Sequence, residues 1–365
     1  MGIKPETFRG CMLGLAVGDA MGYTIDSRSL EEIRRDYGPN GLLGYDLVNG
    51  YADVTSYTQL AAFTANALLV YVTRSRTQGK SIPPVRYIGA ALKEWSRSQH
   101  YCPPERNFCW LSDVPEMKRR HCLDNRMLDI LAKGNLGTPE EPVSYYSHGG
   151  ALTEAIPIAL LADDLYLSDL YRNRLAAEAV AMTHGDPEAF ICGAALTHGL
   201  SLLLHRPEMG VDELLRNTMD AIQMQFGRDY LQTGKLWELL QMARVLAVSD
   251  KVAPMDAMER LGCRSSAEIL AGALYACLTS HGDFDAAMIT AVNHSGRSAA
   301  VGAITGAILG AKLGETALPE FYLDSLEPTR YLLELANDMH HGCPMDRGSS
   351  LYDADWDRKY NHGGR

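Results

Sequence analysis

The sequence lacks an excess of positive charge. Its 34 lysine and arginine residues are outnumbered by 45 aspartate and glutamate residues, which gives a formal net charge of −11 over 365 residues. No stripe or block of basic side chains appears, and the negative charge is spread along the chain. Because nucleic-acid binding depends on clustered basic side chains, these counts argue against a nucleic-acid partner. We expect a soluble, cytoplasmic protein.

The sequence also lacks a long hydrophobic run. The most apolar stretch, 299–311, is too short to cross a bilayer. At the start of the chain, residues 1–6 lead straight into a predicted helix without the apolar segment of a signal peptide. We therefore expect neither a membrane partner nor a targeting signal, and we assign the 299–311 stretch to a buried core.

Cysteine is present, but no C-x-x-C pair occurs among the eight residues. Three of them lie in apolar helical stretches: Cys11, Cys192 and Cys277. Reduced and mostly buried thiols are the expected state. A second group lies close together in the sequence: Cys102, Cys109, His121 and Cys122. Its spacing fits no common zinc site, so we interpret it as a chance cluster in a loop.

Glycine, by contrast, is abundant and regularly spaced at two places. Near the C-terminal end, Gly302, Gly306, Gly310 and Gly314 recur at every fourth position, and near the N-terminus Gly10, Gly14, Gly18 and Gly22 do the same. On a helix, such a spacing forms one smooth stripe that another backbone can approach closely. The two stripes predict a pair of buried helices from opposite ends of the chain, with the functional site at their ends.

The rest of the chain shows helical periods separated by short turns, and no stretch alternates like a strand. Besides the glycine helices, the pattern predicts helices at about 30–37, 60–76, 82–98, 126–133, 168–182, 188–204, 211–226, 230–248, 266–280, 283–292 and 326–339. It also predicts that the glycine turn in 147–157 runs into an apolar helix. No fixed repeat period appears. The expected fold is all-α, a compact orthogonal bundle. We expect one domain over 1–342, with an ordered insertion at 99–124 and a C-terminal extension at 343–365.

Five motifs follow one another along the chain, at 14–22, 55–60, 148–157, 183–189 and 291–314. Together they resemble the ADP-ribosylglycohydrolase family, which includes dinitrogenase reductase-activating and ADP-ribosylarginine hydrolase-like proteins and is related to the J-type lens crystallins. The resemblance covers nearly the whole chain. It implies an all-helical fold with a cleft that holds ADP-ribose over two magnesium or manganese ions.

The two metal motifs of that family are altered here. Relatives hold the ions with a Thr-Asp-Asp triplet and an Asp-x-Asp-Thr/Ser set, whereas this chain has Thr55-Ser56-Tyr57 and Arg297-Ser298-Ala299-Ala300. Only Thr55 is kept. The changes shift the local formal charge by about five units toward positive. Because magnesium depends on carboxylate ligands, we expect no bound metal cofactor.

Arg297 precedes a helix, where unpaired N–H groups and the helix dipole already favour an anion. We hypothesise that Arg297 replaces the ions as the positive centre. It then either pairs internally with Asp19 or Asp26, or faces a phosphate or carboxylate ligand. Glu154 stands where the family has arginine, and we expect it to act as a swapped charge partner of Arg297.

Other positions of the family motifs match this chain better than the metal motifs do. Gly149 and Gly150 can present N–H groups to a phosphate, and His184 matches a residue that lies near ADP-ribose in relatives. The candidate ligand-binding residues are Thr55, Ser56, Tyr57, His148, Gly149, Gly150, His184, Arg297 and Ser298. The candidate acids and bases are Asp19, Asp26 and Glu154, with His148 and Tyr57 as further possibilities.

Three functions stay open at this point. The leading one is a family member without the metal-dependent hydrolysis that binds ADP-ribose, an ADP-ribosylated protein or another small anion. The second is a hydrolase that cleaves the glycosidic bond with positioned acids and bases alone. The third is a structural scaffold, with the insertion at 99–124 and the tail at 343–365 as contact regions. Nucleotide binding loses support if the ring of Tyr57 fills the volume of the lost ions.

Overall fold

The computed structural model describes residues 2–79, 82–100, 102, 108–121, 124–161 and 167–364. These residues form helices, with isolated β-bridges but no strand among them, and so confirm the predicted all-α fold. The α-helices are α1 (Pro5–Tyr23), α2 (Leu30–Tyr37), α3 (Ser56–Gln78), α4 (Pro84–Gln99), α5 (Asn125–Lys133), α6 (Ala155–Ala159), α7 (Asp169–Ala181), α8 (Pro187–His205), α9 (Val211–Phe226), α10 (Gln232–Ala247), α11 (Pro254–Leu261), α12 (Ser266–Thr279), α13 (Phe284–Val292), α14 (Ser298–Leu313), α15 (Glu320–Ser325), α16 (Thr329–His341) and α17 (Ala354–His362). The shorter 3-10 helices are η1 (Trp110–Asp113), η2 (Pro115–Lys118), η3 (Gly149–Glu154) and η5 (Glu315–Ala317).

The two glycine stripes meet in the centre of the fold, as the spacing predicts. Helices α1 and α14 run antiparallel, with Gly10 against Gly310 and Gly14 against Gly306. A Cβ atom placed on Gly14 would lie 2.1 Å from the carbonyl oxygen of Gly306, so the two backbones are in direct contact. An interior glycine costs a helix about 1 kcal/mol relative to alanine. These two helices therefore depend on each other's packing.

The antiparallel arrangement brings the C-terminal end of α1 beside the N-terminal start of α14, where Gly22 faces Ser298. Helix α3 begins at the same end. Its first residue is Ser56, four positions earlier than the apolar pattern indicates, because the Thr55 hydroxyl caps the helix by accepting from the Tyr57 N–H. Three helix ends thus meet where the sequence motifs place the site.

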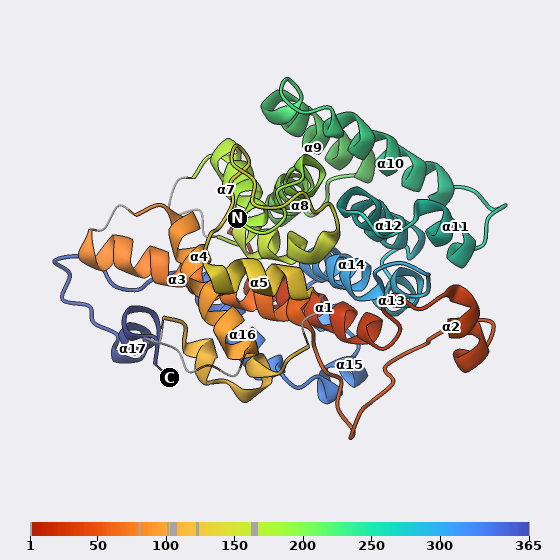
Figure 1. The fold of residues 1–365 in the computed structure, drawn as a ribbon. Helices are drawn as coiled ribbons and strands as arrows, with labels where there is room; N and C mark the ends of the chain where they lie inside the picture. Colours follow the sequence, from red (N-terminus) through yellow and green to blue (C-terminus); the bar gives the residue numbers. More distant parts are fainter. Residues whose placement is uncertain are drawn as a thin grey trace.

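Helices from distant parts of the chain cover this central pair. Figure 1 shows α9, α10, α11 and α12 together on one side, and α3 and α17 on the other. The helix α17, in the C-terminal segment, packs on α3, where Trp356 Nε1 donates to Thr73 Oγ1 at 2.8 Å. Helix α8 is long and apolar enough to span a membrane, but 83% of its apolar window is buried inside the fold.

The sequence pattern does not predict three short helices that the structure contains: α11, α15 and α17. Each has fewer than ten residues, so its helical period gives only a weak signal over the usual window of about 11–18 residues. Within the segment 99–124, the described residues form η1 and η2, and Cys109, Trp110 and Leu111 are fully buried. Residue 101 and the ranges 103–107 and 122–123, which include Cys122, lie outside the described residues.

Candidate functional site

Asp19 lies near the C-terminal end of α1 and is fully buried. Its carboxylate accepts four hydrogen bonds: from the N–H and hydroxyl of Thr55 at 2.9 and 2.7 Å, and from the N–H and hydroxyl of Thr58 at 3.0 and 2.6 Å. Burial raises the pKa of Asp19 to about 6, against the lowering effect of these hydrogen bonds. Both oxygens are used to hold α1 to the start of α3, so Asp19 acts here as a structural tie.

Arg297 lies between Asp26 and Tyr57. Its Nε is 3.2 Å from Asp26 Oδ2, and its Nη2 donates to the Tyr57 hydroxyl at 3.1 Å. The side chain of Asp26 is 7% exposed and that of Arg297 is 23% exposed. Of the two internal partners expected for Arg297, Asp26 forms the ion pair. Asp19 accepts hydrogen bonds from threonines instead.

The same carboxylate also serves the start of α14, because the Ala299 N–H donates to Asp26 Oδ1 at 3.1 Å. The chain therefore supplies its own anion at this helix N-terminus. Burial raises the pKa of Asp26, while the charge of Arg297 and the Ala299 hydrogen bond lower it. Asp26 and Arg297 form an ion pair that is largely shielded from water.

The ring of Tyr57 is only 1% exposed, so it fills space between the helix starts and does not line an open cleft. Burial raises the pKa of its hydroxyl, which keeps this group neutral at physiological pH. Three other candidates from the same motifs are also buried: Thr55, Ser56 and Ser298. The Ser298 hydroxyl is 3.4 Å from the His294 carbonyl oxygen, a contact within its own turn.

Glu154 does not pair with Arg297, so this prediction is wrong. The residue ends η3 and is fully buried, and neither carboxylate oxygen has a hydrogen-bond partner among the described residues. Burial alone raises its pKa well above the ordinary value. The turn of η3, which packs against α3, α8 and α14, directs the side chain into the interior. Glu154 is therefore a neutral core residue and cannot reach a ligand from solvent.

Asp124, His148 and His184, which we call the Asp–His–His cluster, come together beside Arg297. His184 Nε2 is 3.2 Å from His148 Nδ1 and 3.4 Å from Asp124 Oδ2, and His148 Nε2 is also 3.4 Å from Asp124 Oδ2. One ligand atom from each residue lies within 4.8 Å of the others, so this group could hold a metal ion. His184 is fully buried, whereas the side chain of His148 is 34% exposed.

The surroundings of the cluster fix the charge of two members. Burial lowers the pKa of His148 to about 4, and the neighbouring His184, Arg297 and Arg126 act in the same direction. For Asp124, burial is the largest influence and opposes ionisation, but its contacts with His184 outweigh it and the pKa falls to about 2. At neutral pH, the cluster therefore contains a neutral His148 and an anionic Asp124.

Close packing explains the two glycines that begin η3. A Cβ atom on Gly150 would lie 2.7 Å from His184 Nε2, and one on Gly149 would lie 2.5 Å from the Ile269 Cδ1 atom. The lack of a side chain at position 150 leaves room for the imidazole ring of His184. Tyr146 covers the other side of the cluster, with its ring stacked on His148 at 5.6 Å between centroids.

Sequence reasoning missed Asp124. The residue caps α5, since its Oδ1 accepts from the N–H groups of Arg126 at 2.9 Å and Met127 at 3.2 Å. An aspartate before an amphipathic helix is a recognisable capping signal. The signal places the residue at the start of α5 but does not reveal that its second oxygen faces two distant histidines.

His294, in the turn before α14, is fully buried, and its protonation is fixed by its contacts. The Gly296 N–H donates to Nδ1 at 2.9 Å, so Nδ1 carries a lone pair and Nε2, 3.0 Å from the Ala291 carbonyl oxygen, carries the proton. Burial lowers the pKa of His294 to about 4, helped by the charge of Arg264. The folded protein thus keeps this ring neutral where the unfolded chain protonates it.

This difference predicts acid sensitivity. Between pH 6.5 and about 4 the unfolded state binds a proton at His294 that the folded state does not, so the free energy of unfolding falls as the pH is lowered. We expect His294 to account for a loss of about 2–3 kcal/mol between pH 6.5 and pH 4.5. Urea unfolding at both pH values measures this loss. The variant His294→Gln, which offers an acceptor and a donor but no titration, should show a smaller loss; an equal loss would contradict the assignment.

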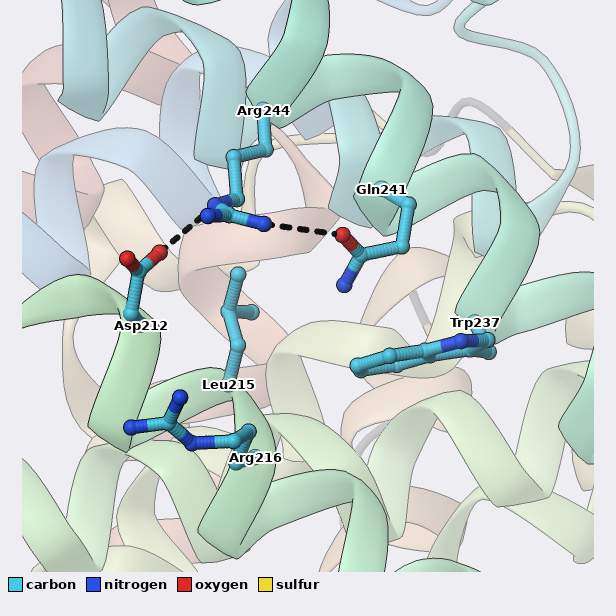
Figure 2. A pocket seen from close by; sticks show the side chains of 6 residues that line it. All are labelled: Asp212, Leu215, Arg216, Trp237, Gln241 and Arg244. Carbon is cyan, nitrogen blue, oxygen red and sulfur yellow. Dashed lines mark hydrogen bonds and ion pairs between the residues drawn. The ribbon is translucent and has the colours of Figure 1, made fainter.

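A surface pocket between α9 and α10 lies apart from these residues (Figure 2). It is lined by Asp212, Leu215, Arg216, Trp237, Gln241 and Arg244. Arg244 Nε forms an ion pair with Asp212 Oδ1 at 2.5 Å, and its Nη1 donates to Gln241. The open space of about 160 Å³ is below the range of about 300–1,000 Å³ typical of small-molecule sites. No candidate site residue lines this pocket.

Comparisons with known proteins bear on the family and the fold of the chain. A family model described as ADP-ribosylglycohydrolase matches residues 3–348. An uncharacterized protein of Archaeoglobus fulgidus is 25% identical over 344 residues, which cover 92% of this chain and 96% of that protein. A solved structure described as an ADP-ribosylglycohydrolase-related protein complex has a TM-score of 0.59 at 22% identity, covers 92% of this chain and 98% of its own, and thus shares the fold. The chain belongs to the ADP-ribosylglycohydrolase family.

Proposed function

We propose that this protein is a family member without the dinuclear-metal hydrolysis, and that it binds an ADP-ribose group, free or attached to a protein. The observation that carries the first part is the place of Arg297. Its guanidinium group lies between Asp26 and Tyr57, where the starts of α3 and α14 meet. The altered motifs belong to the same two helix starts.

The residues present there do not fit a pair of hard divalent cations. Such ions need several carboxylate or carbonyl oxygens, and magnesium uses at least one or two carboxylates. Both oxygens of Asp19 accept hydrogen bonds from threonines, and Asp26 is already paired with Arg297 and with a helix N–H. An ion would have to displace the guanidinium and break these contacts. We therefore expect no metal-dependent step of a reaction at these helix starts.

The buried ring of Tyr57 fills the space between the helix starts and closes it to a nucleotide, so the proposed binding lies on the partly exposed side of this region. Arg297 makes its contacts through Nε and Nη2, which leaves Nη1 without a hydrogen bond to any described residue. The exposed guanidinium of Arg126 lies 5.2 Å from the centroid of the Tyr146 ring, and both arginines are close enough to lower the pKa of His148. Two cations beside stacked rings suit a phosphate group next to a nucleobase or ribose.

Titration calorimetry with ADP-ribose tests the proposal. We expect binding that is the same in magnesium and in EDTA, and a weakening of about tenfold or more for Arg126→Ala, which removes one cation without touching the buried ion pair. The matched control is Arg358→Ala, an exposed arginine of α17 paired with Asp355. Binding that requires magnesium would contradict the loss of the metal centre, and no heat in either buffer would favour a scaffold.

The second function, hydrolysis without these ions, gains no specific support from the geometry. Of its three candidate acids, Asp19 is saturated by hydrogen bonds, Asp26 is paired, and Glu154 is fully buried. Release of ADP-ribose from a modified arginine substrate, abolished by Asp26→Asn, would favour this function over simple binding.

A further inference from the structure

The Asp–His–His cluster is built from three separate parts of the chain. Asp124 precedes α5, His148 precedes η3, and His184 follows α7. Asp124 Oδ2 is 3.4 Å from His184 Nε2 and 3.4 Å from His148 Nε2, and His184 Nε2 is 3.2 Å from His148 Nδ1, so His148 could offer either nitrogen. Two atoms that bind one tetrahedral ion at about 2.0–2.1 Å are about 3.3 Å apart. The two distances from His184 therefore match those between ligands of a single ion.

Contacts around the cluster orient two of these atoms. Thr183 Oγ1 is 2.9 Å from His184 Nδ1, and a proton on Nδ1 directed at this hydroxyl leaves the lone pair of Nε2 facing the cluster. The Oδ1 atom of Asp124 is held by the N–H groups at the start of α5, which turns Oδ2 toward the histidines. Partners of this kind, which fix a ligand through its other polar atom, are typical of metal sites.

The cluster has a negative formal charge but two arginines nearby. With the protons of the neutral imidazoles on their outer nitrogens, the carboxylate of Asp124 and two lone pairs meet around one point, an arrangement that a cation would satisfy. Arg297 and Arg126 raise the electrostatic cost of a cation, so binding has to come from direct bonds to nitrogen. Imidazole suits zinc and neighbouring transition metals, whereas magnesium and calcium prefer oxygen.

We propose that Asp124, His148 and His184 form a mononuclear site for a zinc-class transition-metal ion. This site differs in place and in ligand type from the two-ion oxygen site of the family motifs. Since three protein ligands leave a tetrahedral ion one position short, a water completes the coordination. The partly exposed edge of His148 connects the site to the surface that we propose binds ADP-ribose.

Metal titration of the full chain, after removal of metals by a chelator, tests the site. We expect one equivalent of Co²⁺ to give the visible absorption bands of tetrahedral cobalt, and one equivalent of Zn²⁺ to bleach them. Asp124→Asn keeps the helix cap while removing the charge, and His148→Ala removes a partly exposed ring; each should weaken binding at least tenfold. His184→Gln removes the imidazole at the centre of the cluster and should weaken it further.

The matched control is His362→Ala, because His362 Nε2 is 3.3 Å from Asp357 Oδ2 on the surface of α17 and should not contribute to the bands. If the three residues of the cluster share a proton and bind no metal, titration will give no cobalt spectrum and no heat with zinc. That result would overturn the proposal. Binding that survives all three cluster variants would also overturn it. Since ADP-ribose binding is measured in EDTA, failure of the metal site leaves that result unchanged, and the two proposals can fail separately.

Discussion

Replacing Gly306 by alanine is expected to lower the free energy of unfolding by about 4 kcal/mol or more, a large fraction of the stability of a typical folded protein. The Cβ atom would lie 1.9 Å from the carbonyl oxygen of Gly14. Because the clash is with backbone, no side-chain rotation relieves it, and α1 must move away from α14. Both helices are buried over most of their length, so this movement opens the core. Urea unfolding followed by circular dichroism measures the loss.

The matched control is Gly234→Ala in α10, where an added Cβ atom has no neighbour within 4 Å. Without a clash only the backbone preference acts, and alanine should stabilise the protein by about 0.5–1 kcal/mol. Opposite signs for the same substitution in two helices would locate the effect in the helix contact. A loss below about 1 kcal/mol at Gly306 would mean that the two helices can separate at little cost, contrary to the packing described above.

The glycine stripes show what could be predicted from sequence. Their spacing is a local property, and a smooth helix face has few uses other than close contact with another backbone. Equally spaced stripes fit parallel and antiparallel helices alike, so the antiparallel direction is known only from the structure. The sequence analysis predicts the functional site at the ends of the pair. The structure brings the starts of α3 and α14 together at one of these ends.

The direction of single side chains could not be predicted in the same way. Glu154 occupies a motif position next to the site, but the 3-10 turn of η3 directs its carboxyl into the core. A shift of one residue in such a turn changes the direction by about 120°. Asp124 was not expected at the site but lies in it. Its capping role is local, whereas its contact with two histidines depends on how α5 packs. Charge type and motif position do not contain this information.

Replacing Arg297 by methionine is expected to destabilise the protein by about 3 kcal/mol at neutral pH. The change leaves Asp26, whose side chain is 7% exposed, without its cation, and an uncompensated buried charge costs about 3–5 kcal/mol. We expect the lower end of this range because Asp26 keeps the hydrogen bond from the Ala299 N–H. The double variant Asp26→Asn with Arg297→Met should recover most of the loss, since neither charge remains. Urea unfolding of the wild type, both single variants and the double variant gives the coupling energy.

The cost of the Arg297→Met substitution is also expected to depend on pH. Burial raises the pKa of Asp26 and the charge of Arg297 opposes this, so removing the arginine raises the folded-state pKa further above that of the unfolded chain. The folded state then binds the proton more tightly, and its stability falls as the pH rises until Asp26 ionises in the folded protein. The variant should therefore be closer in stability to the wild type at pH 5 than at pH 8.

The exposed pair Arg358–Asp355 gives the control, for which Arg358→Met should cost less than about 0.5 kcal/mol at either pH. Equal costs at the two arginines would show that Arg297 is not the buried positive centre of these helix starts, and the main support for a site without paired ions would be lost.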